Sequence, residues 1–173
     1  LSEKTLSAIH RALAEICHAL GFREGPLHAE LRLQDRQVFF IEIASRPIGG
    51  RCGKVIQFLT GASLEGLILS NAVRRPVGPR KATAACGVMM IPVPHAGVLR
   101  RVEGINAART VEGVASVEID VREGQRLTPW PEGGPYPGFI FALGDNPDRV
   151  EASLREAHAH LRFVTAPEIA ILV

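Results

Sequence analysis

The chain has 173 residues, of which 46% are hydrophobic and 22% charged, a composition typical of an ordinary globular protein with enough apolar residues for its own core. Twenty Lys and Arg residues nearly balance eighteen Asp and Glu residues, and the net charge of +2 does not favour a nucleic-acid-binding protein. Three cysteines without a Cys-x-x-Cys pair argue against a disulfide scaffold or a zinc ribbon and favour a reducing, cytoplasmic setting.

The first part of the sequence predicts a helix followed by a hairpin. Apolar residues recur at helical spacing from Leu6 to Leu20, with Ser2 as the N-cap and Gly21 as the stop. Because the chain starts at Leu1 and enters this pattern almost at once, we expect it to be a piece of a longer protein. Residues 27–33 alternate between apolar and polar side chains, and residues 38–43 are rich in aromatic and β-branched side chains, so the two segments predict paired strands.

Beyond the hairpin, a Pro-Ile-Gly-Gly segment at 47–50 breaks regular structure, and two short helices are predicted at 54–60 and 63–73. A Pro and Gly cluster near Pro76 separates a second region. The longest uncharged stretch, residues 82–99, contains two prolines and a histidine, so it predicts a strand and a loop and not a membrane span. The elements expected in the second region are strands at 84–91, 97–103, 114–120, 138–143 and 168–173, a short helix at 105–110, and a helix that starts at Asn146-Pro147.

This order of elements predicts an α+β fold and not a doubly wound sheet. We expect two domains, residues 1–76 and residues 77–173, with the boundary at the Pro and Gly cluster.

Two glutamates of the predicted hairpin stand out as candidate ligands. Glu42 interrupts the apolar run 39–43, and Glu30 lies twelve residues earlier on the preceding strand. If Glu30 lies opposite Phe40, both glutamates project from one face as diagonal neighbours, about 7–8 Å apart at the backbone. A register that is one residue different would place them on opposite faces.

Arg46 and the glycine pair Gly49-Gly50 follow Glu42 closely. A guanidinium, open backbone amides and carboxylates that hold a cation are groups that bind phosphate oxygens, and ligands of this type favour Mg²⁺ or Mn²⁺ over zinc. For Arg51 and Lys54, which lie nearby, a solvated position is favoured over contact with a phosphate. The residues alone leave a plainer interpretation open, in which these charges are solvated surface groups.

The motifs resemble the C-terminal half of an ATP-grasp ligase. They are His-Ala-Glu at 28–30, Phe-Ile-Glu-Ile-Ala-Ser-Arg-Pro-Ile-Gly-Gly at 40–50 and Phe-Leu-Thr-Gly at 58–61. The form with Ser-Arg-Pro and the Gly pair is most similar to the amino-acid ligase and carboxylate–amine ligase branch. The resemblance implies the C-terminal part of an ATP-grasp fold, an antiparallel sheet with helices, in residues 1–76, and a C-terminal α+β subdomain in residues 77–173.

By this resemblance, Glu30 and Glu42 bind the Mg²⁺ (or Mn²⁺) ions that bridge the ATP phosphates. Arg46 holds the transferred phosphate or the acyl phosphate, and Gly49 and Gly50 lie near the nucleotide and the incoming amine. Ala44 departs from the family, because the usual residue there is an Asn that contributes to metal binding. The implied reaction joins a carboxylate and an amine, expected to be amino acids, and releases ADP and phosphate.

The resemblance also implies what this chain lacks. The N-terminal half of the ATP-grasp domain, with its phosphate-gripping lysines and adenine hinge, is outside the sequence, so we expect the isolated chain to be inactive and its partner to be that missing half. No nucleic-acid or membrane partner is expected, and a homodimer is an open alternative. Two other functions remain open: a biotin-carboxylase-like enzyme, and a degenerate domain that serves dimerisation or partner binding.

Overall fold

The computed structural model describes residues 1–35, 37–77 and 84–167. The chain divides into two compact units, which we describe separately. Unit 1 has the limits Leu1–Gln57 and Ala62–Arg80, and unit 2 has the limits Phe58–Gly61 and Lys81–Val173. In each, helices combine with antiparallel strands, so the predicted α+β class is confirmed.

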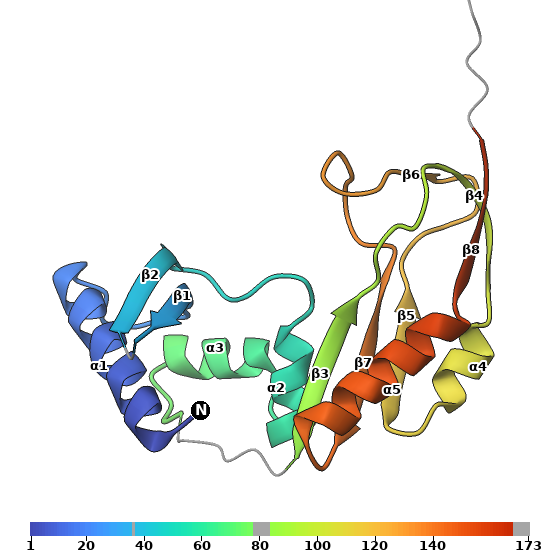
Figure 1. Ribbon diagram of the computed structural model, residues 1–173. Coiled ribbons are helices and arrows are strands. Elements are labelled where there is room, and N and C mark those ends of the chain that lie inside the picture. The colour runs from blue at the N-terminus through green and yellow to red at the C-terminus, as the bar shows by residue number, and fades with distance from the viewer. Residues whose placement is uncertain (36, 78–83, 168–173) are drawn as a thin grey trace, which may run out of the picture. The chain divides into compact units, whose positions relative to one another are not determined.

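Unit 1 starts with the predicted amphipathic helix. The Ser2 hydroxyl accepts a hydrogen bond from the Thr5 N–H at the start of this helix, and Gly21 adopts a left-handed φ of 68° just after its end. Two antiparallel strands and two short helices follow (Figure 1). The elements are α1 (Glu3–Ala19), β1 (His28–Gln34), β2 (Gln37–Ala44), α2 (Gly53–Thr60) and α3 (Leu64–Ala72). The last turn of α2, from Phe58 on, is counted with unit 2.

Unit 2 contains two three-stranded antiparallel sheets, with strand orders β3-β7-β5 and β6-β4-β8. Helix α5 packs against β3 and β7, as Figure 1 shows. The elements are β3 (Ala85–Met90), β4 (Gly97–Glu103), α4 (Ile105–Thr110), β5 (Val114–Ile119), β6 (Arg126–Leu127), β7 (Gly138–Gly144), α5 (Pro147–His160) and β8 (Arg162–Ala166).

Glycine allows α5 to approach its sheet closely. A Cβ atom added at Gly87 of β3 would lie 2.8 Å from Val150 and 3.0 Å from Leu154, two buried residues of α5. The Asn146 side chain accepts a hydrogen bond from the Arg149 N–H and caps the helix at the predicted start.

The buried apolar core lies in unit 2. Its largest fully buried side chains include Ile91, Leu99, Ile140 and Phe141. None of the described residues of unit 1 reaches the same degree of burial. The apolar faces of α1 and of the hairpin therefore stay partly open to solvent.

The strand assignments differ from expectation in two places. Strands β6 and β8 were not predicted, although both pair with β4. The strand expected at 168–173 lies outside the described residues.

Candidate functional site

Glu30 and Glu42 lie directly opposite each other on β1 and β2. The two glutamates therefore share a face, as the metal interpretation requires, but they pair directly and are not the diagonal neighbours of a register with Glu30 opposite Phe40. Residues in direct antiparallel register have Cα atoms about 4.5–5.5 Å apart, so the two glutamates are closer at the backbone than the expected diagonal pair.

A β-bulge produces this pairing. At the tip of the hairpin, Gln34 pairs with Gln37, and the same register continued without interruption would set Glu30 opposite Ile41 and turn Glu42 to the other face. The register shifts between Glu30 and Leu31, which leaves Ile41 as the extra residue of β2. Ile41 is 66% exposed, so the bulge places an apolar side chain in solvent beside Glu42.

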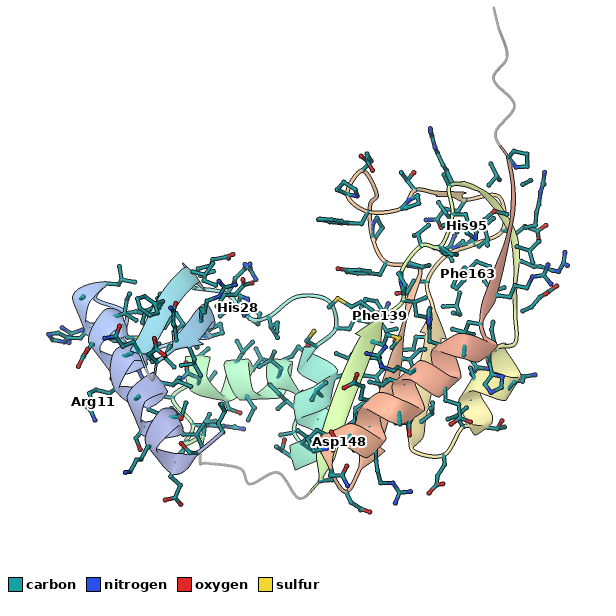
Figure 2. All side chains as sticks on the ribbon, in the orientation of Figure 1. Arg11, His28, His95, Phe139, Asp148 and Phe163 are labelled. Atoms are coloured by element: carbon teal, nitrogen blue, oxygen red, sulfur yellow. The ribbon has the colours of Figure 1, made fainter. Side chains whose placement is uncertain are left out.

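His28, which is labelled in Figure 2, lies two residues before Glu30 on β1 and pairs with Ala44, so it is on the same face as the glutamates. Its Nε2 atom is 3.3 Å from Oε1 of Glu30, and its side chain is only 17% exposed. The small Ala44 side chain, in the position where a family Asn was expected, supplies no polar ligand.

Arg46 contacts the second glutamate. Its Nη2 atom donates to Oε1 of Glu42 at 3.1 Å, and its Nη1 atom donates to the Pro47 carbonyl at 3.2 Å. Both charged side chains are about half exposed, so the ion pair contributes about 1 kcal/mol or less to stability and leaves both groups accessible to a ligand.

The glycine loop, residues 47–51, contains two successive left-handed residues. Gly50 has a φ of 62°, and Arg51 has a φ of 56°. This conformation is open to glycine but costs a side-chain-bearing residue about 1 kcal/mol or more, and such strain is common in functional loops. The thiol of Cys52 donates to the Gly50 carbonyl at 3.7 Å and helps to close the turn.

A cavity of about 470 Å³ lies against this loop, between the first turns of α2 and α3. Its lining includes Gly49 and Gly50, which are predicted site residues, and also Glu65, for which the sequence predicts only a position in a helix. A useful signal was present, since Ser63 caps α3 and places Glu65 in its first turn. The cavity is lined by Pro47, Ile48, Gly49, Gly50, Arg51, Gly53, Lys54, Leu64, Glu65 and Ile68.

The described residues contain no group of three or more His, Cys, Asp and Glu side chains able to hold a metal ion. Glu30 and Glu42 therefore form a two-carboxylate face. Mg²⁺ is commonly bound by one or two carboxylates together with water and substrate phosphates, so the two glutamates match that ligand set.

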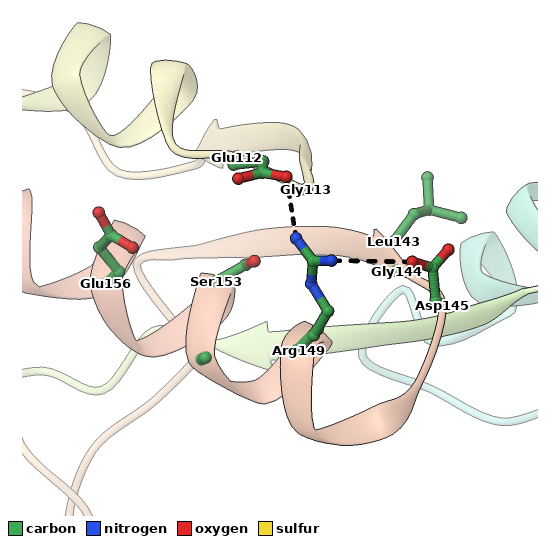
Figure 3. A pocket seen from close by; sticks show the side chains of 9 residues that line it. Glu112, Gly113, Leu143, Gly144, Asp145, Arg149, Ser153 and Glu156 are labelled. Carbon is green, nitrogen blue, oxygen red and sulfur yellow. Dashed lines mark hydrogen bonds and ion pairs between the residues drawn. The ribbon is translucent and has the colours of Figure 1, made fainter.

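A second cavity, of about 320 Å³, lies in unit 2 and includes none of the predicted site residues. There Arg149 of α5 contacts Glu112 at 2.9 Å and Asp145 at 3.8 Å (Figure 3). All three side chains are exposed, and the arginine is already paired with acidic groups. We assign this cavity no part in the site.

Two family models match the sequence. Residues 1–55 match the ATP-grasp domain, and residues 89–166 match the L-amino acid ligase C-terminal domain 2. No curated protein gives a significant sequence match.

Several solved structures have a similar fold. L-amino acid ligase from Bacillus licheniformis is 29% identical, with a TM-score of 0.82 over 96% of this chain and 42% of that chain. Phosphoribosylglycinamide synthetase from Anaerococcus prevotii is 15% identical, with a TM-score of 0.81 over 96% and 43% of the two chains. Biotin carboxylase from Campylobacter jejuni is 14% identical, with a TM-score of 0.67 over 96% and 38%.

The chain therefore belongs to the ATP-grasp superfamily. Within it, residues 89–166 match a C-terminal domain of L-amino acid ligases. The chain spans less than half the length of the solved ligase that it matches. Among the described residues, no helix has the length and apolar character needed to cross a bilayer.

Proposed function

We propose that this chain is part of an ATP-dependent carboxylate–amine ligase that forms an amide bond between amino acids through an acyl phosphate. The observation that carries the proposal is the shared face of Glu30 and Glu42, with Arg46 in contact with Glu42 and the glycine loop directly after it. The match to the L-amino acid ligase C-terminal domain supports the choice of substrates. In this proposal, residues 1–76 belong to the ATP-grasp domain and residues 77–173 form the C-terminal subdomain.

Glu30 and Glu42 would hold Mg²⁺, or Mn²⁺, against the phosphates of ATP. Their exposed carboxylate oxygens suit a hard cation that keeps part of its water shell and takes other ligands from the substrate. The bound cation would neutralise charge on the phosphate oxygens during transfer. His28 is placed to orient Glu30, because its Nε2 lies within hydrogen-bond distance of that carboxylate.

Arg46 would hold the transferred phosphoryl group. Its guanidinium is permanently charged, and its planar fork suits two oxygens of a phosphate. In the proposed reaction a substrate carboxylate oxygen takes the γ-phosphoryl group and ADP leaves. The neutral amine then attacks the acyl carbon. The C–N bond forms, the C–O bond to phosphate breaks, phosphate leaves, and the nitrogen loses one proton and keeps the other as the amide N–H. Backbone amides of Gly49 and Gly50 would approach these oxygens without side chains in the way.

The two alternatives have less support. The likeness to biotin carboxylase, at 14% identity, is one of fold alone. A degenerate binding domain would have no need to retain two carboxylates on one face beside a contacting arginine.

ADP release by the full-length protein, screened against pairs of amino acids with mass spectrometry of the products, tests the proposal. We expect ADP and amide product in equal amounts for at least one pair. ADP release that requires bicarbonate and biotin, or no ADP release with any pair, would contradict it. The isolated 173-residue chain should release no ADP with any pair, because it spans less than half of the ligase that it matches.

The variant Glu42→Gln in the full-length protein tests the metal assignment. Loss of one carboxylate ligand should lower turnover by more than about 100-fold. The free energy of unfolding should change by less than about 1 kcal/mol, since Glu42 is half exposed. Glu24→Gln, at another exposed glutamate of unit 1, is the matched control and should keep full turnover. Unchanged turnover in Glu42→Gln would remove the metal role.

A further inference from the structure

Unit 2 contains a further cavity, of about 490 Å³, that shares no lining residue with the hairpin or the glycine loop. It lies between the loop after β3, the end of α5 and strand β8. Figure 2 labels two residues of its lining, His95 of the loop and Phe163 of β8. The cavity is lined by Pro92, Pro94, His95, His158, Leu161, Arg162, Phe163, Val164 and Thr165.

The polar side chains of this lining can all donate hydrogen bonds, and none of the described residues that line the cavity is acidic. The donors are an arginine, two histidines and a threonine, namely Arg162, His95, His158 and Thr165. The cavity beside Arg149 has the opposite balance, because its lining includes three acidic residues, Glu112, Asp145 and Glu156. Of the two cavities, the one at Arg162 is therefore suited to an anion.

Arg162 makes no side-chain hydrogen bond to the residues that the structure describes, although it faces a carboxylate. Its Nη1 atom is 3.6 Å from Oε2 of Glu103, its pairing partner on β4, and this distance is longer than a hydrogen bond. Oε1 of Glu103 instead accepts the Nε–H of Arg101 at 2.6 Å. One carboxylate thus faces two guanidinium groups, which leaves one positive charge in excess, and the Arg162 side chain is 75% exposed.

We propose that this cavity binds a small phosphate monoester that carries an apolar group. The phosphate lies at Arg162, whose planar fork suits two phosphate oxygens, and the imidazoles of His95 and His158 are further donors. A phosphate monoester offers three terminal oxygens to these donors, whereas a carboxylate offers only two. The assignment goes beyond the proposed ligase reaction, because none of these residues takes part in it.

The apolar part of the lining determines the kind of ester. Pro92 and Pro94 have no backbone N–H, and Leu161 and Val164 add aliphatic surface. An apolar group buried against these residues adds affinity that inorganic phosphate cannot gain. The hydroxyls of a sugar phosphate would lose water against the same residues without gaining donors or acceptors in return. The cavity volume is within the range of about 300–1,000 Å³ that is common for small-molecule sites.

Titration of the 173-residue chain, followed by NMR, tests this site with phenyl phosphate, inorganic phosphate, benzoate and benzyl alcohol. We expect phenyl phosphate to bind at least about 10-fold more tightly than each of the others, because only this compound combines a three-oxygen anion with an apolar ring. The backbone amides whose signals shift should include those of residues 161–165. Equally tight binding of any of the other three compounds would overturn the assignment.

The place of binding is tested in the same titration. Arg46 and the glycine loop are also proposed to contact phosphate oxygens, so the amides of residues 46 and 48–51 are followed together with those of residues 161–165. Shifts in the first set without shifts in the second would place phenyl phosphate at the proposed ligase site and refute the site in unit 2. The titration needs neither ATP nor a metal, so its failure would leave the ligase proposal intact.

Two pairs of variants test the named donors. Arg162→Gln should weaken phenyl phosphate binding at least about 10-fold because it removes the permanent charge, and Arg155→Gln, at an exposed arginine of α5 outside the cavity, is its control. His158 and His160 both lie in the last turn of α5, but only His158 lines the cavity. His158→Ala should weaken binding about 5-fold, as expected for one lost hydrogen bond, and His160→Ala should bind normally. Equal affinities within either pair would refute the proposed contacts.

Discussion

Gly104 precedes α4 with a φ of 81°, and a Cβ atom built on it would overlap the carbonyl oxygen of His160. Gly124 has nearly the same φ, 84°, with open space around the corresponding point. Both substitutions to Ala place a side chain on a left-handed backbone, but only the first meets another backbone segment. We expect Gly124→Ala to lower the free energy of unfolding of unit 2 by about 1 kcal/mol and Gly104→Ala by at least about 3 kcal/mol.

Chemical denaturation of the two variants measures this difference. Both variants place Ala on a left-handed backbone, so the strain of that conformation is common to them. The additional loss of unfolding free energy in Gly104→Ala therefore measures the overlap with His160. Equal midpoints for the two variants would show that the chain near His160 shifts to make room.

Burial of the Cys86 thiol raises its pKa, and a backbone hydrogen bond with Gly87 opposes this rise only in part. Because the thiolate is the reactive form, we expect alkylation of native Cys86 to need a higher pH than alkylation of the same thiol in the unfolded chain. Mass spectrometry of iodoacetamide-treated protein, native and in denaturant, measures both profiles. The folded pKa lies above the unfolded value, so the associated stability is present at neutral pH and is lost as the pH rises through the folded value. Identical native and denatured profiles would contradict the burial effect.

Among individual residues, sequence reasoning could place both glutamates on one face but could not give their register. The alternation of apolar and polar residues predicts which face of a strand a residue occupies. A bulge residue such as Ile41 changes which residues pair, and it cannot be recognised in the sequence because the residues around it are apolar as well. Glu65 was missed for a related reason. The Ser63 cap places it in the first turn of α3, but its position beside the glycine loop depends on how α3 packs.

At the level of elements, the helix caps were the most predictable features, because a cap depends on neighbouring residues only. Asn146 is an example, and its side-chain oxygen accepts the Arg149 N–H at 3.0 Å. Asn146→Ala should lower the free energy of unfolding of unit 2 by about 1 kcal/mol, seen as a fall in Tm of several degrees. Asn146→Ser should recover most of this loss, since Ser also caps well, and failure of Ser to recover stability would indicate a role other than capping.

Strand β8 shows where local reasoning fails. Its five residues, Arg162–Ala166, follow α5 after one residue and pair with β4, about sixty positions earlier in the chain. Pairing partners so distant leave no local sequence signal. The two-residue strand β6 is shorter than any periodic pattern, and it too is recognised only by its pairing with β4.

For the whole chain, the fold class and the family could be predicted from the element order and from the hairpin motif. The strand orders β3-β7-β5 and β6-β4-β8 could not, because they arise from long-range pairing in unit 2. The distribution of buried residues could not be predicted from the sequence either. Both units contain many apolar residues, but among the described residues only those of unit 2 are fully buried.

This distribution predicts unequal stability within one chain. Backbone amides in β3, β7 and α5 should exchange hydrogen most slowly, and amides in α1, β1 and β2 should exchange faster by a factor of at least about 100, because few buried contacts oppose local opening there. Hydrogen exchange followed by mass spectrometry of the intact 173-residue chain measures both sets. Similar protection in the two units would contradict the expectation.

The separation between the core and the candidate site determines where the chain tolerates substitutions. The residues proposed for the ligase reaction, from Glu30 to Gly50, and the cavity beside the glycine loop lie in unit 1, while the fully buried side chains lie in unit 2. Substitutions in the glycine loop therefore do not alter the buried side chains of unit 2, which contribute most to the stability of the fold. A library of variants at Ile48, Leu64 and Ile68 should therefore remain largely folded, because the fully buried side chains lie in the other unit.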